Sequence, residues 1–178
     1  MLINKIRPQD NKGNYNVIIE IPMGDDPVKY EFDKEYNIMK VDRFMPVSMS
    51  YPCNYGFIPS TMSEDKDPID VLVIANYPIK SGVMINVKVI GVLEMEDESG
   101  IDEKIIAVPS LKLDPNFKNI NNIKDLDNLY PMMSKKISHF FENYKKLEEN
   151  KWVKITGFNT NDKAIEMINT SISRFNNQ

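Results

Sequence analysis

The chain has 178 residues, of which 42% are hydrophobic and 27% charged, with a formal net charge of −4. This length and balance predict one globular domain over residues 1–178, and the lack of any basic stripe argues against a nucleic-acid groove. No apolar stretch reaches the roughly 18 residues of a membrane span, the first residues lack the apolar core of a signal peptide, and Cys53 is the single cysteine, so the sequence predicts a cytoplasmic protein.

The first half of the chain is predicted to form short strands. Apolar and β-branched residues predict a strand over 15–21, and alternating apolar and charged residues predict strands over 28–32 and 38–44. Residues 45–59 are rich in proline and aromatic residues, so we expect an irregular loop there, of a length that is often functional. A continuous apolar run predicts a buried strand over 71–75.

The middle of the chain continues the pattern of strands. A longer strand is predicted over 83–93, broken at Gly91, and a short one over 105–108, ended by Pro109. The segment 110–130 is dense in Asn, Asp and Lys and predicts a surface connection with at most a short helix. Many short strands with turn signals between them favour a small closed β-barrel or a sandwich.

The helices are predicted near the end of the chain. Apolar residues at helical spacing predict one helix over about 134–148, with Ser134 as its cap, and another over about 161–175. A last strand is predicted between them over 152–158. The expected fold class is therefore α+β, mainly β, with a β-barrel core and two main helices.

Three aspartates stand close together just before the predicted buried strand. Asp65, Asp67 and Asp70 would repel one another unless a proton or a cation neutralises them. Hard carboxylate oxygens suit Mg²⁺, Mn²⁺ or Ca²⁺ better than zinc or copper. A solvated acidic turn remains the alternative at this stage.

A second acidic cluster, residues 94–104, lies between two other predicted strands. It includes Asp97, Glu98 and Asp102 and ends with Lys104. A solvated hairpin loop would explain it equally well. Because each cluster adjoins a predicted strand, however, both could converge on shared divalent ions.

Several basic and phenolic side chains stand in otherwise apolar or strand-like segments. Lys29, Arg43 and Lys145 could grip phosphate, arginine by its fork and lysine as a point charge. Lys29 and Glu31 share one face of a strand and could equally form a surface ion pair. Tyr144 lies on the apolar stripe of its predicted helix, which favours a core position.

Two tyrosines flank the short segment 52–54 inside the predicted loop. The hydroxyls of Tyr51 and Tyr55 could donate to a phosphate oxygen or cap buried carbonyls. The sequence has no Ser/His/Asp arrangement for acyl chemistry and only one histidine, which excludes a His-rich metal site.

The segment Asp65-Lys66-Asp67-Pro68-Ile69-Asp70-Val71 resembles the signature of the family I soluble inorganic pyrophosphatases of bacterial type, which are built on an OB-type barrel. Further similar segments follow in the same order as in that family and cover nearly the whole chain: residues 41–45, 51–59, 105–109, 140–145 and 151–154. Several separated motifs in one order are far more specific than a single motif.

This resemblance implies a five-stranded OB-type barrel with additional strands, and hydrolysis of inorganic pyrophosphate to two orthophosphates by a metal-activated hydroxide. It implies Asp67 as the general base. It also implies the metal ligands Asp65, Asp70, Asp97 and Asp102. The substrate-binding residues it implies are Lys29, Arg43, Tyr55, Tyr144 and Lys145. Residues that act through metal-bound water or support the ligands would be Glu20, Glu31, Glu98, Lys104 and Tyr51.

The implied cofactor is Mg²⁺, with several ions in each active site and Mn²⁺ as a substitute. Pyrophosphate is the implied partner, without nucleic acid or membrane, and the relatives imply a homohexamer. Two alternatives stand beside this reading: a nucleic-acid-binding OB-type barrel and a Ca²⁺-binding structural module. Neither explains Lys29, Arg43 and Lys145 around the acidic residues.

Overall fold

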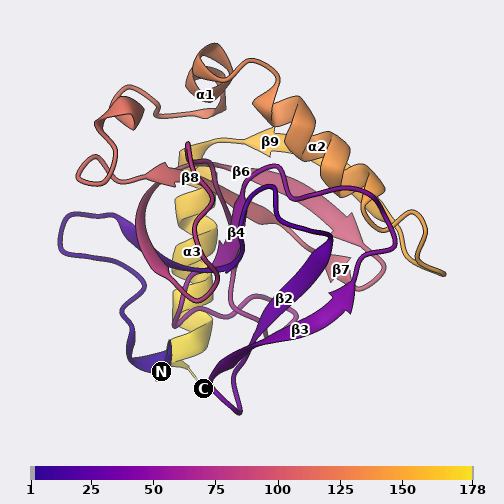
Figure 1. The fold of residues 1–178 in the computed structure, drawn as a ribbon. Helices are drawn as coiled ribbons and strands as arrows, with labels where there is room; N and C mark the ends of the chain where they lie inside the picture. The colour runs from indigo at the N-terminus through magenta and orange to yellow at the C-terminus, as the bar shows by residue number, and fades with distance from the viewer. Residues whose placement is uncertain (1–2, 178) are drawn as a thin grey trace.

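The computed structural model describes residues 3–177 and is built around a closed sheet (Figure 1). Its strands are β1 (Tyr15–Ile21), β2 (Val28–Asp33), β3 (Ile38–Phe44), β4 (Asn54–Phe57), β5 (Asp70–Val73), β6 (Met84–Asp97), β7 (Gly100–Ile101), β8 (Lys104–Pro109) and β9 (Val153–Asn159). The α-helices are α1 (Ile123–Leu129), α2 (Met133–Asn143) and α3 (Asn161–Asn176), and short 3₁₀ turns cover Ile3–Lys5 and Pro115–Phe117.

Strand pairing closes the main sheet into a ring. The order β1-β4-β5-β8-β6 returns to its start because β6 also pairs with β1, while β7 and β9 are added along β6. Pairs in this sheet are antiparallel except β5 with β8, which run parallel. The five strands of the ring confirm the predicted mainly β, α+β fold with a closed β core.

Central strands are buried on both faces, which explains their continuous apolar runs. Alternate residues of β5 enter different core clusters: Val71 and Val73 pack with α3, whereas Leu72 packs with α2. Strand β8 divides its residues in the same way. The closed sheet therefore lies between two apolar layers and forms a rigid platform for the loops at its edge.

A separate hairpin of β2 and β3 projects beside the ring (Figure 1). Phe32 attaches the hairpin to the main sheet. Its aromatic side chain is buried, and its ring centroid lies 6.2 Å from that of Phe57. Ile3 and Ile18 complete this small apolar cluster. Tyr30 of the hairpin also packs against the main core, while much of β3 is exposed.

Helices cover the two sides of the ring. Helix α3 packs against β6, and α2 packs against β9 with α1 beside it. No helix within residues 3–177 combines the length and apolar character that crossing a bilayer requires. The helix predicted over about 161–175 is confirmed, beginning after the cap Thr160, whose side chain accepts from the Lys163 amide.

Several strand predictions differ from the structure; for example, the strand predicted over 71–75 is β5, which covers Asp70–Val73. The segment expected to be an irregular loop contains β4, whose four residues are all buried. The strand predicted to break at Gly91 continues through it as far as Asp97, and the break appears only as a shift of register with β8 between Val89 and Gly91. Pairing with neighbouring strands therefore outweighs the low strand propensity of Gly56 and Gly91.

The helix predicted over about 134–148 is shorter than expected and lacks the predicted cap. It ends at Asn143, after which bonds from Lys146 and Glu148 to carbonyls three residues earlier tighten the chain into turns. At its start, the Ser134 hydroxyl donates to Asp127 at 2.5 Å instead of capping the helix.

Candidate active site

The sheet topology brings the two acidic clusters to one edge. Strands β5 and β8 are parallel neighbours, so their first residues, Asp70 and Lys104, lie at the same end of the sheet. Strand β6 is antiparallel to β8, so Asp97 closes β6 at that end too. Loops 63–69 and 98–103 therefore meet, which the residue pattern alone had left open.

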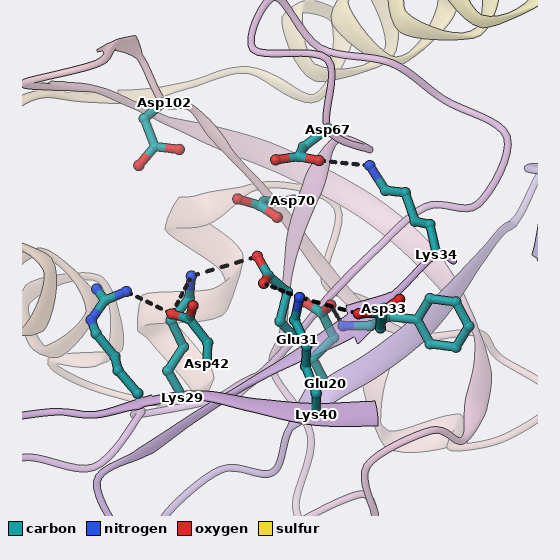
Figure 2. Close-up of polar contacts among 12 residues, drawn as sticks. Glu20, Lys29, Glu31, Asp33, Lys34, Lys40, Asp42, Asp67, Asp70 and Asp102 are labelled. Atoms are coloured by element: carbon teal, nitrogen blue, oxygen red, sulfur yellow. Dashed lines mark hydrogen bonds and ion pairs between the residues drawn. The ribbon is translucent and has the colours of Figure 1, made fainter. Parts of the chain in front are cut away.

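At this edge lies a cleft of about 730 Å³. The carboxylates and basic groups predicted for the site all line it, together with the three predicted tyrosines: Glu20, Lys29, Glu31, Arg43, Tyr51, Tyr55, Asp65, Asp67, Asp70, Asp97, Glu98, Asp102, Lys104, Tyr144 and Lys145. Figure 2 shows Asp67, Asp70 and Asp102 facing Lys29 and Glu31 across the opening.

Lys104 joins two of the aspartates. Its ammonium lies 2.5 Å from a carboxylate oxygen of Asp70 and 2.5 Å from one of Asp102, and its side chain is only 4% exposed. Burial alone would lower the pKa of Lys104, but the two carboxylates outweigh burial and raise it. A single cation thus already lies between the two acidic clusters.

Asp97 and Glu98 are held by lysines from the chain that follows α2. Lys145 donates to Asp97 at 2.6 Å and lies 3.6 Å from Glu98, which also pairs with Lys151. Although burial works against ionisation, hydrogen bonding to Lys151 and the charge of Lys145 hold the pKa of Glu98 at about 2. Glu98 is therefore ionised at neutral pH.

Other carboxyl groups are harder to ionise. Burial, together with the charges of Asp70 and Glu31, raises the pKa of Glu20 to about 8, although its Oε1 accepts from the Phe32 amide at 2.8 Å. Burial and neighbouring aspartates also raise the pKa values of Asp65 and Asp102. These groups lie where additional positive charge would favour their ionised forms.

The basic groups on the hairpin are paired but partly exposed to the cleft. Lys29 and Arg43 are cross-strand partners of β2 and β3, and both contact Asp42, at 3.4 and 2.8 Å. Lys29 also lies 4.0 Å from Glu31, the ion pair that the strand pattern permitted. Arg43 reaches Glu148, after α2, at 3.4 Å.

Aromatic rings packed against one another form the floor between these groups. Tyr51 lies 5.2 Å from Tyr55 and 4.5 Å from Phe140, and Phe140 lies 5.3 Å from Tyr144, measured between ring centroids. Burial raises the pKa values of all three tyrosines, so their hydroxyls remain protonated at neutral pH. They are therefore available as hydrogen-bond donors to an anion.

Asp67 stands at the mouth of the cleft, where Lys34 donates to its Oδ1 at 2.6 Å (Figure 2). Its own amide donates to Asp65 at 2.9 Å, which fixes the turn that carries both residues. Its side chain is 64% exposed, so water can reach it directly.

The donor set is chemically suited to hard divalent cations, although the side chains are not arranged as a finished cage. Among residues 3–177, no group of three or more Asp, Glu, His or Cys side chains is close enough to hold one ion. The carboxylates face lysine ammonium groups instead. Asp70 and Asp102 share the ammonium of Lys104, and burial raises the pKa of Asp65, so added positive charge would favour the ionised form of these hard oxygen donors.

Several charged residues that pair with the predicted site residues were not predicted from the sequence. Lys34 contacts Asp67, Asp42 contacts Lys29, Glu148 contacts Arg43 and Lys151 contacts Glu98. All are common surface residue types, and their partners are distant in sequence or belong to a charged strand. The one available signal was charge complementarity between segments, which does not identify a partner.

Comparison with known proteins agrees with this geometry. Residues 17–176 match the family model described as inorganic pyrophosphatase. The chain is 57% identical to the inorganic pyrophosphatase of Rickettsia felis over 98% of its own length and 99% of the relative's. It is 54% identical to that of Saccharolobus solfataricus over 89% and 90% of the two chains.

Solved structures agree as well. The structure of an inorganic pyrophosphatase from Coxiella burnetii superimposes with a TM-score of 0.90 at 46% identity, covering 96% of this chain and 99% of that one. The resemblance predicted from the motifs is confirmed, and the two alternative readings are not supported. By its family match, its relatives and its fold, the chain belongs to the inorganic pyrophosphatase family.

Proposed function

We propose that this protein is an enzyme that hydrolyses inorganic pyrophosphate to two orthophosphates with Mg²⁺. One observation carries the proposal: a single cleft collects the carboxylates of two distant acidic clusters and the basic groups of the β2–β3 hairpin and the segment after α2. A nucleic-acid-binding barrel would need basic and aromatic residues without these acids. A calcium module would not need the phosphate-gripping groups.

Basic and phenolic side chains are assigned to the two phosphoryl groups. Arg43 offers a planar fork of donors, and Lys29 and Lys145 supply point charges. Tyr55 and Tyr144 donate hydroxyl hydrogens from the aromatic floor, since both stay protonated. Together these donors would stabilise charge that moves onto the departing phosphate.

Asp67 is assigned as the general base that takes a proton from the attacking water. Two observations support this: it lines the cleft beside the aspartates, and its carboxylate is solvent-exposed at the mouth. Asp65, Asp70, Asp97 and Asp102 are assigned as cation ligands.

The inorganic pyrophosphatase family is metal-dependent in general. Mg²⁺, with Mn²⁺ as a substitute and several ions per site, is our proposal for this chain. When bound, the ions supply positive charge that offsets the phosphates and makes water easier to deprotonate. Glu20, Glu31 and Glu98 would act through water, Tyr51 would support the floor, and Lys104 would steady Asp70 and Asp102.

A direct assay tests the proposal. Phosphate release from pyrophosphate is measured with Mg²⁺ and with EDTA, and p-nitrophenyl phosphate serves as the control substrate. We expect release from pyrophosphate only with Mg²⁺ and little release from the control. Equal rates on both substrates, or release unaffected by EDTA, would contradict the proposal.

The proposal also covers the domain organisation, the cellular location and the oligomeric state. We treat residues 1–178 as one catalytic domain because the cleft draws on segments from Glu20 to Lys145. A cytoplasmic location accords with the single cysteine, Cys53, which is buried with its thiol pKa raised to about 12. A homohexamer is expected from the resemblance and would be measured by light scattering.

A further inference from the structure

Lys34 lies opposite Asp67 across the mouth of the cleft. Its ammonium donates to Oδ1 of Asp67 at 2.6 Å, although the two residues are separated by 33 positions and lie on different parts of the fold (Figure 2). The side chains of Lys34 and Asp67 are 55% and 64% exposed. Ion pairs that are this exposed contribute little to folding stability, so stability does not account for the pair.

The position of Lys34 is set by the hairpin that carries it. Two residues earlier, Phe32 is buried against Phe57 and its amide donates to Glu20. Asp33 then accepts from the amides of Glu35 and Tyr36, each at 2.9 Å, which fixes the turn after β2. The backbone at Lys34 is therefore held on both sides.

The backbone at Asp67 is also fixed by hydrogen bonds on both sides. The Ser63 amide donates to the Asp67 carbonyl at 2.7 Å, and the Asp67 amide donates to the Asp65 carboxylate at 2.9 Å. Between these aspartates, Lys66 adopts φ of 72°, a left-handed conformation that non-glycine residues seldom take. A closed turn thus presents the Asp67 side chain toward the hairpin.

We propose that Lys34 is a positioning residue that orients the Asp67 carboxylate by holding Oδ1, so that Oδ2 faces the attacking water and accepts its proton. This inference rests on the proposed function of Asp67 as the base. An exposed aspartate side chain otherwise samples several rotamers, and fixing one oxygen reduces the fraction of unproductive orientations. The lysine exchanges no proton in this step.

Kinetics of Lys34→Met and Lys34→Arg provide the first test. If Lys34 acts through the base, Lys34→Met lowers kcat about 10-fold while KM stays within about twofold, because only the reacting geometry is disturbed. Lys34→Arg retains a donor to Oδ1 and restores most of kcat. The matched control is Lys154→Met, which removes another exposed lysine paired with a carboxylate, Glu96 at 2.8 Å, outside the cleft, and leaves both constants unchanged.

A double-mutant cycle with Asp67→Asn shows whether the two residues act together. In the Asp67→Asn background, adding Lys34→Met should lower kcat by less than about twofold, since the base that Lys34 orients is already lost. An equal loss in both backgrounds would overturn the proposal. So would a raised KM with unchanged kcat, which would make Lys34 a substrate-binding group.

A spectroscopic readout tests the contact without relying on activity. The ¹⁵N signal of the Lys34 ammonium, assigned by its disappearance in Lys34→Met, should shift in Asp67→Asn. An unshifted signal would overturn the proposal, even if Lys34→Met is less active. Failure of the wild-type protein to hydrolyse pyrophosphate would instead refute the proposed function, and with it any role of Lys34 in that reaction.

Discussion

At the scale of single residues, opposite charges in the cleft are matched pair by pair. Lys104 holds Asp70 and Asp102, Lys145 holds Asp97, and Lys34 holds Asp67. Such pairing keeps many carboxylates together in a small volume without prohibitive repulsion. The same carboxylates must respond differently to substitution if they have the different roles assigned to them.

Removing the charge of the assigned base separates catalysis from folding. Asp67→Asn should lower kcat by about 10²-fold or more, the usual scale of general-base loss, while Mg²⁺ binding and the unfolding midpoint change little. Steady-state kinetics, calorimetry and urea denaturation measure the three effects. Asp162→Asn, at an exposed position in the first turn of α3, is the control. A kcat close to that of the wild type would show that another group is the base.

Substitution of an assigned ligand should affect the cation instead. Asp70→Asn removes one carboxylate charge beside Lys104, and we expect the Mg²⁺ concentration for half-maximal activity to rise about 10-fold or more. A magnesium titration of activity, together with calorimetric titration without substrate, measures the change. An unchanged titration curve would contradict the assignment.

Glu20 makes stability depend on pH. Its pKa is about 8 in the folded protein against an ordinary value of 4.5, so folding takes up a proton between these pH values and wild-type stability falls as pH rises through them. Glu20→Gln removes this loss. Relative to the wild type, the variant should gain on the order of a few kcal/mol between pH 5 and pH 8.5.

Urea denaturation in EDTA at the two pH values measures that difference, because chelation keeps cations from stabilising the ionised carboxyl. The glutamine oxygen can still accept from the Phe32 amide, which preserves the local contact. A stability difference that is the same at both pH values would mean that Glu20 titrates normally in the folded protein.

At the scale of elements, β4 shows why close packing matters to the site. A Cβ added at Gly56 would lie 1.9 Å from the backbone oxygen of Ile18 on β1. The two strands approach this closely next to Tyr55, one of the assigned substrate-binding residues. Glycine is required here because of space rather than backbone conformation.

Gly56→Ala should therefore destabilise the fold by about 3 kcal/mol or more, because backbone must move to make room. Chemical denaturation measures the loss. Gly13→Ala is the control: nothing lies within 4 Å of the added atom there, and only its φ of 85° opposes a side chain. If both substitutions cost the same, steric contact with Ile18 is not what restricts Gly56.

Elements with a clear pattern were predictable from the sequence, and those set by tertiary contacts were not. Helix α3 follows its apolar periodicity, and strand β3 has the predicted bounds, although its Ile38, Val41 and Phe44 are exposed. Strand β4 has none, because it is buried throughout and includes Asn54 and Gly56. Helix α2 ends early although Leu147 continues its apolar spacing; that side chain is 69% exposed and contributes nothing to the core.

The site was predictable only through the family motifs. Residues alone left the acidic clusters open as solvated turns, because a sequence does not show that loops 63–69 and 98–103 meet. The parallel pairing of β5 with β8 brings them together, and this pairing has no local signal. The role of Lys34 was not predictable for the same reason, since its partner Asp67 lies across the cleft from the hairpin.

At the scale of the whole molecule, ring closure is what makes the cleft. Pairing of β6 with both β1 and β8 fixes the edge where the acids gather, and Phe32 holds the hairpin that carries Lys29 and Arg43 against it. The two walls of the site therefore come from separate sheets. The distance between these walls therefore determines whether a small anion such as pyrophosphate fits between them.

A crystal structure with Mg²⁺ and imidodiphosphate, a slowly hydrolysed analogue of pyrophosphate, tests this account most directly. We predict density for the analogue between Arg43 and Lys145, and for Mg²⁺ ions on Asp65, Asp70 and Asp102. Binding of the analogue in the neighbouring cleft lined by Glu103, Lys163 and Arg174, or Mg²⁺ bound away from the aspartates, would contradict it.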